Sequence, residues 1–161
     1  MQKIILLVIM LLASIANACE PTIDLKVNEN VNPTDNNPSL IVFVSLGMPK
    51  CSLQQWNLQV AKAGGVLVLR GFVNNSMKQT VKKITEILGK EPQGGFSIDP
   101  QKFKQFNIKV VPTVVVTGND PASFDSVSGD ASLTYALEKI MADGKYSGIA
   151  KVWLKKLQGN L

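Results

Sequence analysis

The chain has 161 residues and carries 17 Lys and Arg against 12 Asp and Glu, which gives a net charge of +5. It contains no histidine, and this excludes catalytic triads and metal sites that are built on imidazole. The two cysteines, Cys19 and Cys51, are too few for a cysteine-rich metal site or a disulfide framework. We therefore expect no metal, no cofactor and no catalytic residue.

The lysines are spread along the chain rather than gathered in one run, and aromatic residues are not interleaved with them. Proteins that bind single-stranded nucleic acid combine basic and aromatic side chains in that way. We therefore expect a protein partner and no nucleic acid.

Residues 1–18 have the pattern of a secretion signal. Lys3 supplies the positive charge, residues 4–12 are all apolar, and Ala16-Asn17-Ala18 has the small residues of a cleavage site. The apolar run is too short to span a bilayer comfortably. We expect this segment to direct the chain to the periplasm and to be removed there.

Cys19 follows the predicted cleavage site directly, and three interpretations of it are open. In the first it is the lipidated residue of a lipoprotein, although Ala16 stands where the lipobox leucine is usual. In the second it pairs with Cys51 in an oxidising compartment. In the third it lies near the site by coincidence. An association with the membrane follows only from the first interpretation.

The remaining chain divides into two regions. Residues 19–39 begin with a short extended stretch and continue into a linker rich in Asn and Pro. Residues 40–161 are long enough for one compact domain with its own core.

The domain opens with an unbroken apolar run at 40–44, which predicts a strand buried on both faces. Ser52 is expected to cap the helix that follows, and Gly64-Gly65 to end it. Residues 66–69 predict a second buried strand. Ser76 is expected to cap the next helix, whose inward stripe comprises Met77, Val81, Ile84 and Leu88.

Asp99-Pro100 predicts the start of a short helix with Phe103 and Phe106 facing inward. Residues 110–116 predict a strand with Pro112 near its start, at a position where a cis peptide bond is expected. A short antiparallel strand is expected at 124–127.

Two helices are expected to close the domain. Ser132 caps the first, with Leu133, Leu137, Ile140 and Met141 inward. The second covers 149–157, with Ile149, Val152, Trp153 and Leu157 inward.

The resulting order is β-α-β-α-β-β-α with an extra C-terminal helix. It predicts an α/β protein of thioredoxin-like fold, in which helices flank a central mixed sheet. In this fold Pro112 is expected to lie across from Met48 and Pro49.

Thioredoxin-like enzymes carry a CxxC motif after the first central strand, where it opens the next helix. Here Met48 stands in the place of the attacking cysteine and Cys51 in that of the resolving one. A thioether cannot form a disulfide, so the sequence predicts no dithiol cycle. Cys51 lies beside Lys50 at a helix start, and the alternative is an oxidoreductase or isomerase that uses this thiol alone.

Four blocks of the sequence together resemble one known family. They are FVSLGMP at 43–49, LVLRGFVNNS at 67–76, IDP at 98–100 and VPT at 111–113. The set is similar to the TrbC-type pilus assembly proteins of F-type conjugative systems. The resemblance implies a thioredoxin-like periplasmic protein that assembles the pilus of a type IV secretion system without catalysis, beside a TraW-type partner. Met48 and Pro49 fit the family pattern, whereas Cys51 departs from it.

The partner is expected to bind at strand ends and loops, where a rigid scaffold presents side chains. Met48 offers an adaptable apolar contact and Arg70 a directional charge. The expected surface comprises Met48, Pro49, Cys51, Arg70, Asn74, Asn75 and Pro112. A purely structural interpretation stays open, in which Arg70 pairs with a local acid, the asparagines form a turn and Cys51 fills the first helical turn.

Overall fold

The computed structural model describes residues 38–89, 92–120 and 122–159. The predicted secretion signal, the predicted linker up to residue 37 and Cys19 lie outside these ranges. None of the helices within the ranges has the length and hydrophobicity that a bilayer crossing requires.

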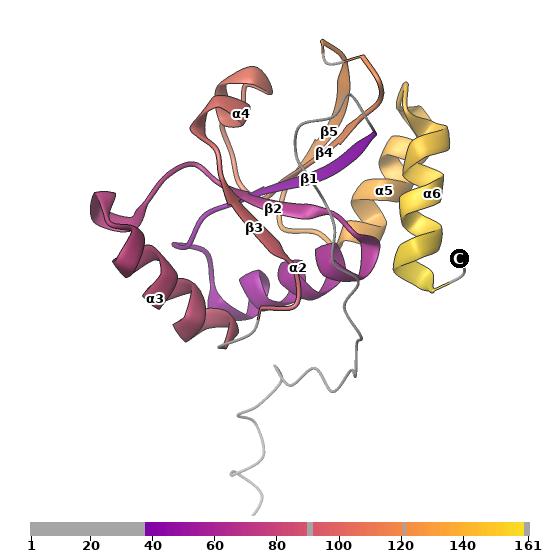
Figure 1. Ribbon diagram of the computed structural model, residues 1–161. Coiled ribbons are helices and arrows are strands. Elements are labelled where there is room, and N and C mark those ends of the chain that lie inside the picture. The colour runs from indigo at the N-terminus through magenta and orange to yellow at the C-terminus, as the bar shows by residue number, and fades with distance from the viewer. Residues whose placement is uncertain (1–37, 90–91, 121, 160–161) are drawn as a thin grey trace, which may run out of the picture.

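A five-stranded mixed sheet forms the centre of the domain, with the strand order β3-β2-β1-β4-β5 (Figure 1). The strands are β1 (Ser39–Val44), β2 (Val66–Leu69), β3 (Gly95–Ile98), β4 (Thr113–Thr117) and β5 (Phe124–Ser128). The first three are parallel, and Val44 pairs with Leu69 at their carboxyl ends. β4 runs antiparallel to β1, with Thr113 opposite Phe43, and β5 completes a hairpin.

Within the described ranges, six helical elements connect and cover the strands. They are α2 (Lys50–Ala63), the short 3-10 helix η1 (Val73–Asn75), α3 (Met77–Leu88), α4 (Pro100–Gln105), α5 (Leu133–Asp143) and α6 (Ser147–Gln158). In Figure 1, α4 lies on one face of the sheet and α2, α5 and α6 lie on the other.

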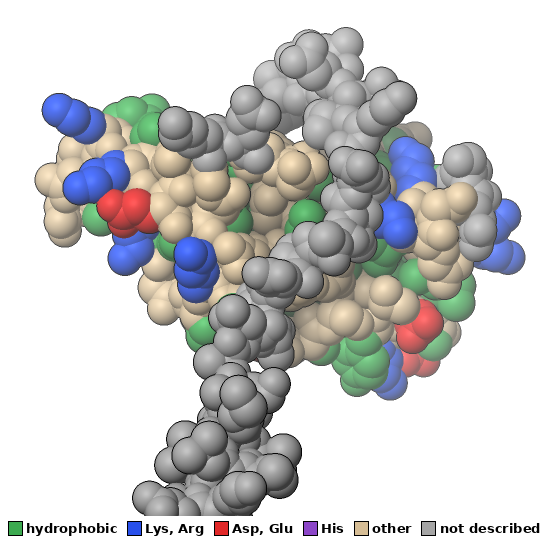
Figure 2. Space-filling model, turned by 90° about the horizontal axis from the view of Figure 1, so that it is seen from below, with side chains coloured by type: hydrophobic (Ala, Val, Ile, Leu, Met, Phe, Trp, Pro, Cys, Tyr) green, Lys and Arg blue, Asp and Glu red, His purple; other side chains and the backbone are tan. Residues whose placement is uncertain are grey.

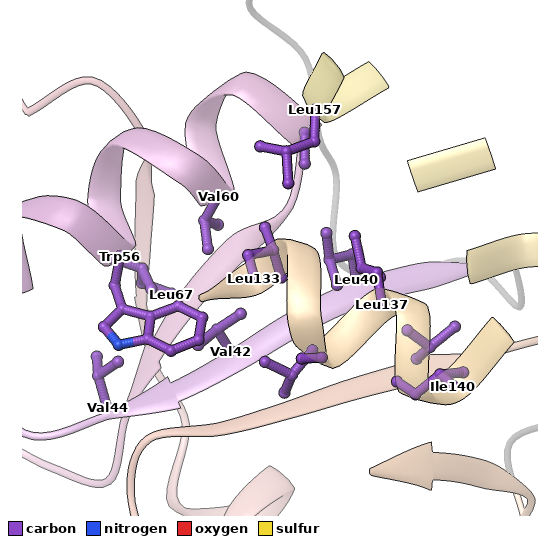
Figure 3. Close-up of a cluster of buried hydrophobic side chains, with 14 of the residues drawn as sticks. Leu40, Val42, Val44, Trp56, Val60, Leu67, Leu133, Leu137, Ile140 and Leu157 are labelled. Atoms are coloured by element: carbon purple, nitrogen blue, oxygen red, sulfur yellow. The ribbon is translucent and has the colours of Figure 1, made fainter. Parts of the chain in front are cut away.

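The larger core lies between the sheet and helices α2, α5 and α6. Leu40, Val42 and Val44 point from β1 into this core because alternate residues of a strand face the same side. Figure 3 shows them among Trp56, Leu133 and other buried side chains. Burial of each such side chain contributes about 1.5 to 3 kcal/mol.

The opposite face of β1 is buried too, under α4. Ile41 and Phe43 belong to this second cluster, in which the Phe43 ring meets the ring of Phe103 edge-on at 4.7 Å and that of Phe106 at 5.8 Å. Burial on both faces explains why residues 40–44 form an unbroken apolar run rather than an alternating one.

Most predicted helix ends are confirmed, but Ser52 is not a cap. The helix α2 begins at Lys50, and Pro49 occupies its N-cap position without a side-chain hydrogen bond. The hydroxyl of Ser52 instead donates to the carboxylate of Asp130 at 2.8 Å. By contrast, the predicted caps Ser76, Asp99 and Ser132 each accept a hydrogen bond from a backbone N–H in the first turn.

Some predicted inward stripes are wrong at their margins. Met77 and Val81 are 58% and 53% exposed, because α3 buries Thr80 and Ile87 instead. Figure 2 shows hydrophobic side chains exposed among the blue cations at the left of the view, where α3 lies. Met141 and Val152 are also exposed. The remaining residues of these stripes are buried or half-buried.

Two features of the sheet differ from the prediction. β3 was not expected, and it extends the parallel part of the sheet beyond β2. The predicted strand at 110–116 begins only at Thr113, after the cis bond between Val111 and Pro112. The expected thioredoxin-like α/β fold is nevertheless confirmed, since the parallel β1-α2-β2 unit pairs with an antiparallel hairpin that follows a cis-proline, and α6 is the extra C-terminal helix.

Candidate functional site

The ends of several strands meet at one edge of the sheet. Val44 and Leu69 are register partners at the ends of β1 and β2, and the chain leaves β2 through Arg70. The pairing of Phe43 with Thr113 brings the start of β4 to the same edge. Ligands of open α/β sheets bind at the carboxyl ends of parallel strands, so this edge is the natural place for a site.

A groove of about 500 Å³ opens at this edge. Its walls come from residues 44–47 at and after the end of β1, residues 69–73 at and after the end of β2, single residues of α3 and α4, and Lys109 and Val111 before β4. The lining contains three cations, Arg70, Lys83 and Lys109, and no carboxylate. The groove is therefore lined by apolar and positively charged residues.

A second hollow of about 380 Å³ lies next to the groove. The two hollows share Arg70, Phe103 and Lys109, and the second adds Lys104 and likewise has no carboxylate in its lining. Arg70 and Phe103 thus stand as a common wall between two adjacent depressions.

Arg70 is held in place by two contacts. Its Nη2 donates a 2.9 Å hydrogen bond to the carbonyl oxygen of Ile108. Its guanidinium carbon lies 4.9 Å from the centre of the Phe103 ring, within the range of a cation–π contact. Neither ion pair found among the described residues includes Arg70, so the pairing with a local acid that the purely structural interpretation supposed is not seen there.

The asparagines after β2 form a tight turn. Asn74 and Asn75 both have positive φ angles, 48° and 53°, a conformation that asparagine tolerates better than most residues. The amide of Asn74 donates to Oε1 of Gln79 at 2.9 Å. These contacts agree with the interpretation of the two residues as a turn, and both side chains remain exposed.

A buried threonine fixes this turn to α3. The hydroxyl of Thr80 accepts a 2.8 Å hydrogen bond from the backbone N–H of Val73 and donates to the carbonyl oxygen of Ser76 at 2.8 Å. Val73 lines the groove, so Thr80 holds one of its walls.

The segment at the start of α2 carries the other predicted contacts. Met48 is half-buried against the larger core, whereas Pro49 is exposed. Cys51 has no disulfide partner among the described residues and is exposed at the second residue of the helix. The backbone N–H of Met48 bonds to the carbonyl oxygen of Ser45 at 3.0 Å, which closes the turn between β1 and α2.

Pro112 is buried beside the end of β1. Its carbonyl oxygen accepts a 2.9 Å hydrogen bond from the backbone N–H of Gly129, which ties the start of β4 to the end of β5. Pro112 is therefore a buried residue that stabilises this edge of the sheet.

Of the seven predicted contact residues, only Arg70 lines the groove itself. Met48, Asn74 and Pro112 each follow directly on a lining residue. Lys83, Phe103 and Lys109 were not predicted as contact residues, because they come from different elements and share no motif. None of the three lies at the end of a strand, so no signal in the sequence pointed to them. Within the described ranges no cluster of acidic or cysteine side chains has the arrangement of a metal site.

The sequence of the chain matches the model of a known protein family. Residues 42–140 match the model of the type-F conjugative transfer system pilin assembly proteins, TrbC. The chain belongs to this family. A TrbC relative, the "Periplasmic protein TrbC" of Escherichia coli strain K12, is 31% identical over 110 residues. The match covers 68% of this chain and 51% of that protein, so the chain spans about half the length of the curated relative.

Two solved structures are similar to this TrbC family member at low identity. StoA from Bacillus subtilis superposes with a TM-score of 0.44 at 17% identity, over 62% of this chain and 79% of its own. The structure of MTB dsbF in its mixed oxidized and reduced forms superposes with a TM-score of 0.43 at 16% identity, over 79% and 83%. Likenesses of this degree carry no conclusion about activity.

Proposed function

We propose that this TrbC family member is a periplasmic protein that assembles the pilus of a type-F conjugative transfer system, and that it works by binding another protein without catalysis. The family description and the name of the relative support the pilus and the periplasm. The pattern of a secretion signal at 1–18 supports export.

The observation that carries the non-catalytic part is the start of α2. This is the place where a thioredoxin-like enzyme needs two thiols, and here Met48 and Cys51 occupy the two positions. A disulfide cannot form between a thioether and a thiol, so one turnover of dithiol exchange has no second sulfur to complete it. At this edge the fold instead presents a groove that is lined by apolar and cationic residues.

The test is complementation of a donor strain that lacks this protein. We expect Cys51→Ser to restore mating frequency and pilus number to the wild-type level, because the proposed role needs no thiol. The matched substitution Met48→Lys, which puts a charge on an adaptable apolar contact, should reduce both. Loss of mating in Cys51→Ser at a normal protein level would refute the non-catalytic role.

A TraW-type envelope protein is the proposed partner, in line with the resemblance of residues 67–76. Affinity capture from a donor cell envelope, followed by mass spectrometry, tests this partner directly. Its absence from the captured proteins, with the groove intact, would count against it.

One observation favours a second candidate function, a thiol–disulfide exchange that uses one cysteine. Cys51 is exposed in the first turn of α2, where its thiol is accessible to a disulfide substrate. Reduction of a disulfide-linked peptide in the presence of glutathione, abolished by Cys51→Ser, would establish it. Equal rates for the wild type and the variant would remove it.

A further inference from the structure

We propose that the two hollows on either side of Arg70 bind an extended acidic segment of the assembly partner, with its carboxylates on the cations and its apolar side chains in the hollows. This inference rests on the proposed function, since it requires a protein partner. It adds the chemistry of the segment that is recognised.

The charges at the site are one-sided. Arg70, Lys83, Lys104 and Lys109 line the two hollows, and neither lining contains a carboxylate. None of the four takes part in the ion pairs found among the described residues. Opposite charge on the partner would complement them, and such complementarity selects partners and fixes their register.

Arg70 is prepared to receive a carboxylate. A guanidinium has five N–H donors in a planar fork. One hydrogen bond, to Ile108, and the stacking on Phe103 hold the plane of the group. Less side-chain freedom is therefore lost when a carboxylate binds to the remaining donors.

The shape of the site suits an extended chain. The two hollows lie side by side with Arg70 and Phe103 as their common wall, so one segment can cross both. Successive side chains of an extended segment point in opposite directions, and alternate ones can enter the hollows. Phe72, which lines the larger hollow, is 42% exposed and offers apolar surface for such a side chain.

Nucleic acid fits this lining less well. Binding of single strands needs several exposed aromatic faces for successive bases. The aromatic residues of the two linings are Phe72 and Phe103, and Phe103 is buried with Arg70 over its ring. The apolar walls favour a peptide.

The experiment uses the chain from Cys19 onward with its linker in place, and two pools of fluorescein-labelled nonapeptides as probes. In the first pool Asp or Glu alternates with Leu, Val or Phe. In the second pool Asn or Gln replaces every acid. Fluorescence anisotropy at 50 and 200 mM NaCl should show that the acidic pool binds at least tenfold more tightly than the amide pool, with affinity falling as salt rises.

Paired variants separate the site from net charge. Lys83→Gln with Lys109→Gln removes two cations of the larger hollow and leaves the contacts of Arg70 intact. Lys151→Gln with Lys155→Gln removes the same charge from the exposed side of α6. We expect the first pair to weaken binding of the acidic pool at least tenfold and the second pair to change it less than twofold.

Four results would overturn the inference. The first is equal binding of the two pools, and the second is equal effects of the two variant pairs. The third is binding of a dT12 oligonucleotide or of phosphatidylglycerol vesicles in place of the peptides. The fourth is binding of the acidic pool only after four acids of the linker are changed to amides, namely Glu20, Asp24, Glu29 and Asp35. The last result would assign the hollows to the linker of the chain itself. The proposed function has its own readout, since mating and partner capture that persist in Lys83→Gln with Lys109→Gln would leave that function standing while this inference fails.

Discussion

The indole nitrogen of Trp56 donates a 3.0 Å hydrogen bond to the carboxylate of Asp130. The same carboxylate accepts the hydroxyl of Ser52, so two residues of α2 are tied to the segment between β5 and α5. Trp56 is only 3% exposed. Loss of the acceptor would leave a buried N–H without a partner.

Asp130→Ala should therefore lower the free energy of unfolding by about 1 to 3 kcal/mol. Asp143→Ala removes an exposed carboxylate at the end of α5 and should change it by less than about 0.5 kcal/mol. Urea denaturation followed by tryptophan fluorescence measures both. Equal effects of the two substitutions would show that the bond to Trp56 contributes nothing specific.

Thr80→Val should destabilise the domain by about 1 to 3 kcal/mol, because the backbone N–H of Val73 loses its acceptor while the shape of the side chain is kept. Thr80→Ser keeps the hydroxyl and should cost less. Amide hydrogen exchange at Val73 is the direct measurement. Unchanged protection of that amide in Thr80→Val would contradict the proposed hold on the groove wall.

Gly118→Ala should be strongly unfavourable, since a Cβ at this position would overlap the ring of Tyr146. Overpacking of this kind costs about 1 to 3 kcal/mol. Gly148→Ala is the matched control, because a Cβ there meets no atom within 4 Å and alanine favours the helix α6. Thermal melting should thus move down in the first variant and stay or rise in the second.

Arg70→Ala should weaken capture of the envelope partner by about 1 to 3 kcal/mol of binding free energy if its charge is paired across the interface. The fold should remain, because β2 and the core do not depend on the guanidinium. Quantitative pull-down and a thermal melt on the same preparation measure the two effects. Unchanged capture together with earlier melting would make Arg70 a structural residue.

The strands of the core could be predicted because a strand that is buried on both faces consists of consecutive apolar residues. Residues 40–44 and 66–69 are such runs, and both became strands. β3 gives no such signal, since its four residues include Gly95 and Ser97 and none of them is fully buried. β3 forms because it pairs in parallel with the edge of β2 that faces away from β1.

The buried faces of the helices were predicted less well, because the spacing of apolar residues carries no information about hydrogen bonds. α3 turns Thr80 inward, where its hydroxyl bonds to two backbone groups, and Met77 and Val81 are exposed as a result. The prediction that Ser52 caps a helix failed for the same reason, because its hydroxyl donates to Asp130 and does not bond to the start of the helix.

The position of the candidate site followed from the order of strands, but its lining did not. Arg70 was predicted because it follows a strand directly at the carboxyl edge of the sheet. Lys83 and Lys109 reach the same groove from α3 and from the segment before β4, and only the folded arrangement brings them together.

The direction of β1 decides how the groove is presented. The chain enters the domain at Ser39, and the groove lies beyond Val44 at the other end of that strand. Six residues of strand span about 20 Å. Any segment that precedes Ser39 therefore joins the domain at the pole opposite the groove, so that the point of attachment and the groove lie at the two ends of β1.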